Sequence, residues 1–148
     1  MLESGRILLL TNDDGIDAPG LAVLAGVARN FGTTHTVAPN GPRSGCGHMF
    51  NTHASFGFEA RGERCHCVDG TPVDCVRLGL HHLAPGAEWV LSGINDGGNL
   101  GVDVYASGTV AAVREATLLG RPAIALSQYI AWGRPVDWDR AARMATRV

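Results

Sequence analysis

The chain has 148 residues and a formal net charge of −2, with 12 basic residues that are all arginine. This length predicts a single domain over residues 1–148, and the balanced charge argues against a nucleic-acid partner. The absence of lysine excludes a Walker-type phosphate loop and a lysine Schiff base. No apolar run is long enough to span a membrane, and residues 1–6 lack a signal-peptide pattern, so we expect a cytoplasmic protein without a membrane partner.

The first element in the chain is an apolar run followed by two carboxylates. Residues 7–10 (Ile-Leu-Leu-Leu) show no polar alternation, which is typical of a strand buried on both faces of a parallel sheet. Asp13 and Asp14 follow its carboxyl end, where open α/β sheets bind ligands. Two carboxylates about 4 Å apart repel by roughly 4 kcal/mol at an effective dielectric of 20. The pair therefore predicts a divalent cation, with an Asx-turn and a helix cap as the alternative.

The next segments complete a βαβ unit. Asp17 is a candidate N-cap, Pro19 suits a first turn, and apolar residues at helical spacing run to a stop at Gly32. A short strand is predicted over 34–39. Residues 40–52 then form a glycine-rich loop whose backbone, Ser44 hydroxyl and Arg43 guanidinium could bind an anion; a long flexible excursion is the alternative.

The second half of the chain repeats the alternation of strands and helices. Residues 53–68 are predicted to form one or two extended segments. A helix is then predicted to follow, with Thr71 as its N-cap and Pro72 as its first residue. A buried strand over 89–93 leads into a glycine-rich loop over 94–101. The helix that starts near Ser107 offers free N–H groups to an anion. A strand over 122–127 and a helix from Trp138 follow.

The four cysteines are at positions 46, 65, 67 and 75. Their spacing lacks the pattern of common zinc sites, so reduced thiols are expected, with a structural zinc and a disulfide as the alternatives.

Three loops fall at the carboxyl ends of predicted parallel strands, at 11–15, 40–48 and 94–101. Their carboxylates, hydroxyl and amide oxygens suit Mg²⁺, Mn²⁺ or Ca²⁺ rather than zinc, and their glycines suit phosphate. This combination favours phosphoryl chemistry. A haloacid-dehalogenase-type phosphatase needs D-x-D after the first strand, and Gly15 occupies the place of its second Asp. Attack by a metal-activated water is therefore the better mechanism.

Four ordered blocks resemble the SurE family, the stationary-phase survival proteins with 5′-nucleotidase activity. The blocks are residues 7–20, residues 37–39 continuing to Ser44 and His48, residues 70–76, and residues 92–95 continuing to 99–101 and 107–110. The resemblance covers roughly residues 6–130. It implies a three-layer, Rossmann-like α/β fold with a mostly parallel sheet, shortened at the C-terminus relative to the family.

The resemblance also implies a substrate and a set of site residues. The implied substrate is a nucleoside 5′-monophosphate, and the implied ligands of a divalent metal are Asp13, Asp14, Ser44 and Asn95. It implies phosphate contacts from Gly45, Asn99, Ser107, Gly108 and Thr109, for which helix capping is the alternative role of the hydroxyls. His48 joins Asp13 and Asp14 as a candidate catalytic residue, either as general acid or as phosphate contact, with loop packing as the alternative.

Three departures from the family pattern bear on function. Asn40 stands where the family usually has Asp, Met49-Phe50 stand where it usually has Ser or Thr after the histidine, and family chains continue well beyond position 148. The family's dimer or tetramer is the expected assembly. The rival functions are a non-catalytic nucleotide- or phosphate-binding module and a phosphatase for short polyphosphate or 3′-nucleotides.

Overall fold

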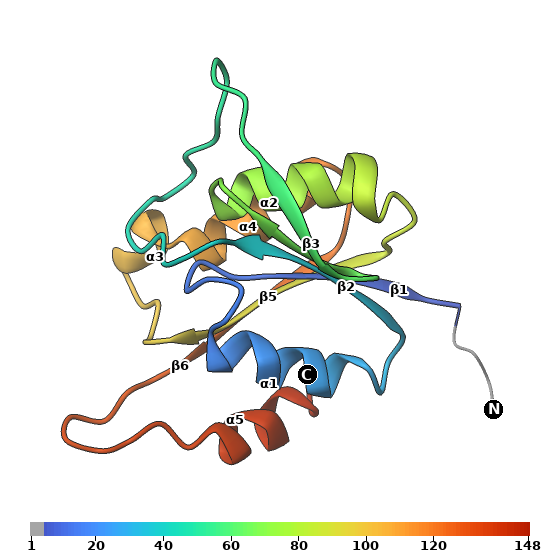
Figure 1. Ribbon diagram of the computed structural model, residues 1–148. Coiled ribbons are helices and arrows are strands. Elements are labelled where there is room, and N and C mark those ends of the chain that lie inside the picture. Colours follow the sequence, from blue (N-terminus) through green and yellow to red (C-terminus); the bar gives the residue numbers. More distant parts are fainter. Residues whose placement is uncertain (1–4) are drawn as a thin grey trace.

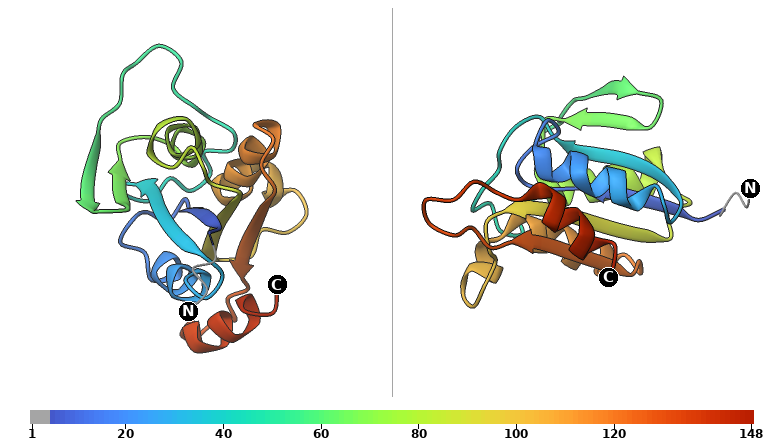
Figure 2. Two further views of the ribbon diagram at one scale, coloured as in Figure 1. Left: turned by 90° about the vertical axis from the view of Figure 1, so that its right-hand side faces the viewer. Right: turned by 90° about the horizontal axis from the view of Figure 1, so that it is seen from below.

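A computed structural model describes residues 5–148 and contains a six-stranded sheet in the order β3-β4-β2-β1-β5-β6 (Figures 1 and 2). All neighbouring strands are parallel except β3, which is antiparallel to β4 at one edge. The mostly parallel sheet predicted from the sequence is confirmed. The strands are β1 (Ile7–Thr11), β2 (Thr33–Pro39), β3 (Phe58–Gly62), β4 (Cys65–Val68), β5 (Trp89–Asp96) and β6 (Ala123–Gln128).

Helices cover both faces of the sheet, which gives the three layers expected (Figure 1). α1 and α5 lie on one face, and α2 and α4 pack together on the other. No helix within residues 5–148 is long and apolar enough to cross a membrane. The helices are α1 (Pro19–Ala28), α2 (Pro72–Leu78), α3 (Asp103–Ala106), α4 (Gly108–Leu118) and α5 (Trp138–Ala145), and a π-helical turn, η1 (Gly79–Leu83), continues α2.

The apolar run of β1 is buried from both sides, as its lack of alternation predicts. Leu9 packs in the core beneath α2 and α4, whereas Leu8 and Leu10 join Leu21 of α1 in a second cluster on the opposite face. Each of these leucines is at most 4% exposed. Alternate side chains of a strand point to opposite faces, so only a strand sandwiched between helices needs an unbroken apolar sequence.

Local sequence signals predict where the helices begin, and one of these predictions is wrong. Thr71 caps α2 as predicted, because its hydroxyl accepts from Asp74 N while the Asp74 carboxylate accepts from Thr71 N, a reciprocal capping box. The prediction that Asp17 caps α1 is wrong. The N-cap is Ala18, whose side chain cannot accept a hydrogen bond, and the helix begins at Pro19, whose missing N–H needs no partner.

The chain order creates a topological switch point between β1 and β5. β1 leads into α1 on one face of the sheet, whereas β5 leads through α3 into α4 on the other face. The loops that leave the carboxyl ends of these neighbouring strands therefore diverge and open a crevice, which is where open α/β sheets bind ligands.

Candidate metal and phosphate site

The turn after β1 presents the two aspartates at this crevice. The Asn12 side chain is fully buried and closes the turn, since its Nδ2 donates to Gly15 O (2.8 Å) and its Oδ1 accepts from Gly15 N (3.2 Å). Gly15 adopts φ +107°, and a Cβ there would lie 3.0 Å from Gly41 Cα. The Asx-type hydrogen bonding of this turn is made by Asn12 and not by either aspartate, while Asp13 is buried and Asp14 is partly exposed.

Thr109 connects two residues that the resemblance implies as metal ligands. Its Oγ1 donates to Asp13 Oδ1 (2.6 Å) and lies 3.3 Å from Asn95 Oδ1. Asp13 is 5% exposed and Thr109 is fully buried. Asn95 Nδ2 donates to Gly97 O (2.7 Å), which orients the amide so that its oxygen faces Thr109. Asp13 and Asn95, from β1 and β5, are therefore held around one hydroxyl.

Asp14 carries negative charge that its surroundings do not neutralise. Burial raises the pKa of Asp14, and the carboxylates of Asp13 and Asp96 raise it further, while a hydrogen bond from Asp96 N (3.1 Å) to Asp14 Oδ2 lowers it. The net effect is a raised pKa. A cation bound beside Asp13 and Asp14 would remove this repulsion.

The loop after β2 is tied to Asp13 and to the junction of α3 and α4. Arg43 N donates to Asp13 O (2.7 Å), and Gly47 N donates to Ala106 O (2.9 Å). Ser44 and Gly45 lie between these two anchors and are exposed. The Ser44 hydroxyl makes no hydrogen bond with any residue of 5–148, so it stays available to a ligand.

α4 begins directly against Asp13. A Cβ at Gly108 would lie 2.8 Å from Asp13 Cβ and 2.9 Å from Cys46 Sγ, so the close approach requires glycine. Ser107 accepts from Val110 N (3.1 Å) and caps the helix, which is the alternative role named for it. Free N–H groups and the dipole of this 11-residue helix therefore lie beside the aspartates.

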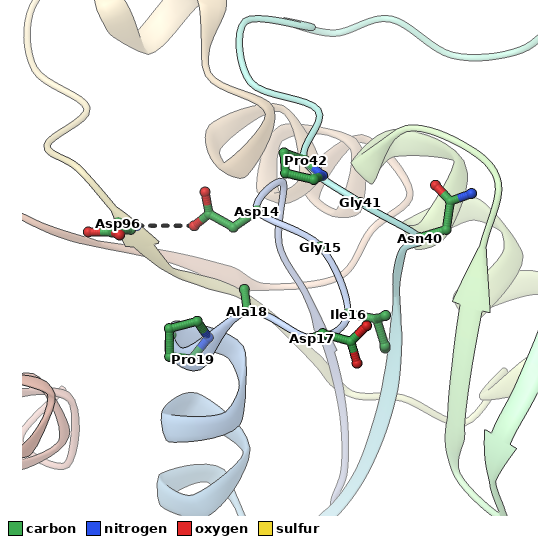
Figure 3. Close-up of a pocket in the computed structure, with 11 residues that line it drawn as sticks. Asp14, Gly15, Ile16, Asp17, Ala18, Pro19, Asn40, Gly41, Pro42 and Asp96 are labelled. Atoms are coloured by element: carbon green, nitrogen blue, oxygen red, sulfur yellow. Dashed lines mark hydrogen bonds between the residues drawn. The ribbon is translucent and has the colours of Figure 1, made fainter.

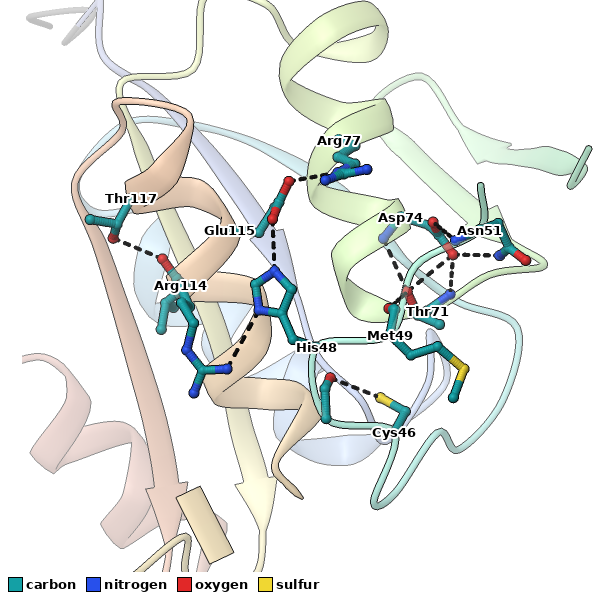
Figure 4. Close-up of polar contacts among 12 residues, drawn as sticks. Cys46, His48, Met49, Asn51, Thr71, Asp74, Arg77, Arg114, Glu115 and Thr117 are labelled. Atoms are coloured by element: carbon teal, nitrogen blue, oxygen red, sulfur yellow. Dashed lines mark hydrogen bonds and ion pairs between the residues drawn. The ribbon is translucent and has the colours of Figure 1, made fainter. Parts of the chain in front are cut away.

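Asn99 and His48 are turned toward other partners. Asn99 Nδ2 donates to Ser127 Oγ (2.7 Å), which fastens the loop after β5 to β6. His48 Nε2 lies 2.8 Å from Glu115 Oε2, and His48 Nδ1 lies 3.5 Å from Arg114 Nη1 (Figure 4). Glu115 and Arg114 both belong to α4. These contacts match the loop-packing alternative for His48, and its catalytic role stays a prediction.

Glu115 is a buried charge that the sequence reasoning missed. It is 3% exposed, and Arg77 Nε of α2 donates to its Oε1 (2.6 Å) while His48 approaches the other oxygen (Figure 4). Burial acts to raise the pKa of Glu115, but the hydrogen bonds and charges of Arg77 and His48 outweigh it, and the net pKa is lowered. Its partners lie 38 and 67 positions away, so no local pattern marks it.

The cysteines and the acidic groups do not form a zinc-type centre. All four cysteines, which lie within residues 5–148, are free thiols as expected. Nowhere in that range do three His, Cys, Asp or Glu side chains gather in a way that could hold a metal. The set of Asp13, Asp14, Ser44 and Asn95 includes only two residues of those types, and its oxygen donors are those that hard divalent ions prefer.

Comparison with known proteins agrees with this architecture. The family model described as "Survival protein SurE" matches residues 8–148. The chain belongs to the SurE family. A protein of Rhodospirillum rubrum named 5′-nucleotidase SurE is 54% identical over 123 residues, which are 82% of this chain and 47% of that protein. A 5′-nucleotidase SurE of Pelobacter propionicus is 47% identical over 143 residues, or 95% of this chain and 57% of that one.

A solved structure supports the SurE fold directly. The crystal structure of the SurE protein from Aquifex aeolicus matches with a TM-score of 0.89 at 34% identity, covering 96% of this chain and 58% of that chain. The chain spans 46% to 62% of the length of the curated relatives it matches.

Proposed function

We propose that this SurE-family chain carries the site of a metal-dependent phosphomonoesterase that hydrolyses nucleoside 5′-monophosphates. The observation that carries the proposal is the Asp13–Thr109–Asn95 arrangement at the switch point, against the start of α4. The names of the curated relatives support the choice of substrate.

The residues present fit a hard divalent ion, Mg²⁺ or Mn²⁺, with Ca²⁺ as a further option. Thr109 occupies only one oxygen of Asp13, and Oδ2 of that carboxylate accepts no hydrogen bond from residues 5–148. Burial raises the pKa of Asp14, and the neighbouring carboxylates of Asp13 and Asp96 raise it further, so a bound cation would favour its ionised form. Asp13, Asp14, Ser44 and Asn95 would hold the ion, which would supply Lewis-acid polarisation of the phosphoryl group and a lowered pKa for the attacking water.

The protein's own groups would position the phosphate. Backbone N–H groups of Gly45 and of the first turn of α4, at Gly108 and Thr109, are donors that stabilise charge on phosphoryl oxygens. Ser107 caps α4 at the same place and Asn99 bonds to Ser127, so each side chain already has a protein partner. Thr109 would act mainly by orienting Asp13 and Asn95, because its hydroxyl is buried against both.

Phosphate release from 5′-AMP and 5′-GMP tests the proposal. With Mn²⁺ or Mg²⁺ we expect turnover that EDTA abolishes and added metal restores, with 3′-AMP and tripolyphosphate as comparison substrates. Robust turnover in metal-free buffer would contradict the mechanism. Nucleotide binding without phosphate release in metal-replete buffer would favour the non-catalytic binding module instead. A dimer or tetramer is part of the same proposal, and sedimentation of the chain tests it.

A further inference from the structure

The loop after β2 folds into two consecutive turns beside the proposed metal site. Cys46 N donates to Arg43 O (3.2 Å) and closes the first turn, residues 43–46, which we call the Ser44 turn. Met49 N donates to Cys46 O (3.2 Å) and closes the second turn. Ser44 and Gly45 lie inside the first turn, so the direction of that turn sets where the Ser44 hydroxyl and the Gly45 N–H point.

The upstream side of the Ser44 turn is fixed to the residues that follow β1. Gly41 lies against Gly15, because a Cβ on Gly15 would be 3.0 Å from Gly41 Cα (Figure 3). Arg43 N donates to Asp13 O (2.7 Å). Since these contacts hold only the upstream side, the direction of the turn also depends on what holds its downstream side.

The downstream side is held by α4 and by the residue before it. Gly47 N donates to Ala106 O (2.9 Å), and His48 Nε2 lies 2.8 Å from Glu115 Oε2 (Figure 4). Arg114 Nη1 lies 3.5 Å from His48 Nδ1. Because a guanidinium can only donate, Nδ1 is the acceptor and Nε2 is the nitrogen that donates to Glu115. Both ring nitrogens of His48 are therefore engaged by the protein.

Glu115 reaches the same loop a second time through Arg77. Arg77 Nε donates to Glu115 Oε1 (2.6 Å), and the guanidinium carbon of Arg77 lies 3.8 Å from the centre of the Phe50 ring. A guanidinium over an aromatic face makes an attractive cation–π contact. Because Glu115 is buried, loss of either partner would leave a buried carboxylate oxygen without its donor, which favours keeping both. One carboxylate thus holds the loop directly at His48 and indirectly at Phe50.

We propose that Glu115 is a positioning residue for the proposed phosphomonoesterase site. Through His48 and Arg77 it fixes the direction of the Ser44 turn, and this direction sets the affinity of the site for metal and phosphate. His48 is the connecting side chain in this arrangement and donates no proton to the leaving group. The inference rests on the proposed function, because the ligands that the turn presents belong to that site.

Substitutions of His48 separate a connecting side chain from a general acid. His48→Leu removes both hydrogen bonds, whereas the amide nitrogen of His48→Gln can still donate to Glu115. For His48→Leu we expect Mn²⁺ affinity and kcat/KM for 5′-AMP to fall about tenfold each, and His48→Gln should recover most of both losses. Loss of a general acid would instead lower kcat equally in the two variants with Mn²⁺ affinity unchanged, and that result would overturn the inference.

The leaving group gives a second distinction between the two roles of His48. p-Nitrophenolate departs without protonation, whereas the alkoxide of a nucleoside needs a proton from an acid. The positioning role predicts that His48→Leu lowers kcat/KM for p-nitrophenyl phosphate by the same factor as for 5′-AMP. A loss confined to 5′-AMP would identify His48 as the general acid and would contradict the proposal.

Glu115→Gln tests the carboxylate itself, and Asp137→Ala is its matched control. Both variants remove one negative charge and both should lose stability, because Asp137 caps α5 by accepting from Arg140 N (2.8 Å). α5 lies on the opposite face of the sheet from α4 (Figure 1). We expect Mn²⁺ affinity to fall about tenfold in Glu115→Gln and to stay at the wild-type value in Asp137→Ala. Wild-type Mn²⁺ affinity in both variants would show that Glu115 is merely structural.

Hydrogen exchange separates failure of this inference from failure of the proposed function. The amides of Cys46 and Gly47 donate to backbone carbonyls on the two sides of the second turn's start, so they report on the loop without metal or substrate. We expect both to exchange about tenfold faster by local opening in Glu115→Gln, and at the wild-type rate in Asp137→Ala. If no phosphomonoester is hydrolysed but exchange and Mn²⁺ affinity change as expected, the enzymatic proposal fails and the positioning role stands. Unchanged exchange in Glu115→Gln would overturn the positioning role, whatever the hydrolysis assay returns.

Discussion

Thr109 Oγ1 donates a 2.6 Å hydrogen bond to Asp13 Oδ1, between residues 96 positions apart in the chain. The same oxygen lies 3.3 Å from Asn95 Oδ1. One buried hydroxyl at the start of α4 thus orients a carboxylate from β1 and an amide from β5. A partner of this kind fixes the direction of a ligand oxygen and reduces the reorganisation needed when a metal binds.

Removing that hydroxyl should weaken metal binding without destroying the fold. Thr109→Val keeps the side-chain volume but leaves Asp13 Oδ1 without its donor. We expect Mn²⁺ affinity to fall roughly 10- to 100-fold and the free energy of unfolding to fall by about 1–2 kcal/mol. Thr109→Ser keeps the hydroxyl and is the control, with affinity near that of the wild type. Calorimetric titration measures the Mn²⁺ affinity of both variants. Equal Mn²⁺ affinities for the valine and serine variants would refute the positioning role.

The contact between α4 and Asp13 predicts that Gly108 tolerates no side chain. In Gly108→Ala the new Cβ would fall 2.8 Å from Asp13 Cβ, so the helix or the aspartate must move. We expect a loss of about 1–3 kcal/mol in unfolding free energy, together with weaker Mn²⁺ binding. Gly26→Ala, at an open and exposed position of α1, should instead stabilise the chain by about 0.5–1 kcal/mol. A Gly108→Ala protein as stable as Gly26→Ala would contradict this packing.

The raised pKa of Asp14 predicts that the metal-free site reduces stability. A carboxyl whose folded pKa lies above its unfolded value stabilises the fold at low pH, and this contribution is lost as the pH rises from below about 4 through the folded pKa. Asp14→Asn removes the charge and can still accept the hydrogen bond from Asp96 N. In metal-free buffer at pH 7 we expect its melting temperature to rise by roughly 1–4 °C. A lower melting temperature for Asp14→Asn would show that the ionised Asp14 does not destabilise the folded chain.

Glu115 has the opposite pH dependence. Its pKa is lowered in the folded chain, so its stabilisation is present above the unfolded value of about 4.3 and is lost as the pH falls through the folded pKa. Glu115→Gln should lower the free energy of unfolding at pH 7. The loss should be only about 1–2 kcal/mol, because Arg77 and His48 are partly exposed to solvent. The wild-type and variant values should converge below the folded pKa. Denaturant unfolding across pH 3 to 7 is the measurement, and a constant difference over that range would exclude the ion-pair account.

The sequence predicts elements whose signals are local. The apolar run of β1, the Thr71 and Pro72 helix start and the glycine-rich segment after β2 all appear close to their expected limits, because each depends on neighbouring residues. The four-residue helix α3 and the continuation of β5 through Asn95 and Asp96 were not predicted. α3 is too short to show periodicity, and the glycines near Asn95 indicate a loop although the strand continues.

Long-range contacts mark the limit of prediction from the sequence. Asp13 and Asn95 could be expected near each other, because the carboxyl ends of parallel strands meet at one edge of a sheet. Thr109 lies between Asp13 and Asn95, and Glu115 contacts both His48 and Arg77. Both arrangements depend on how α4 packs against α2 and against the loop after β2. No spacing in the sequence encodes those distances.

The central claim is that Asp13 and its neighbours hold a divalent ion, and a calorimetric titration with Mn²⁺ tests it most directly. We predict one binding event per wild-type chain, lost in Asp13→Asn although the circular dichroism spectrum is unchanged. Asp139→Asn, which removes an exposed carboxylate on α5, should bind Mn²⁺ as the wild type does. Equal Mn²⁺ affinity in the wild type and Asp13→Asn, or no Mn²⁺ binding by the wild-type chain, would contradict the account.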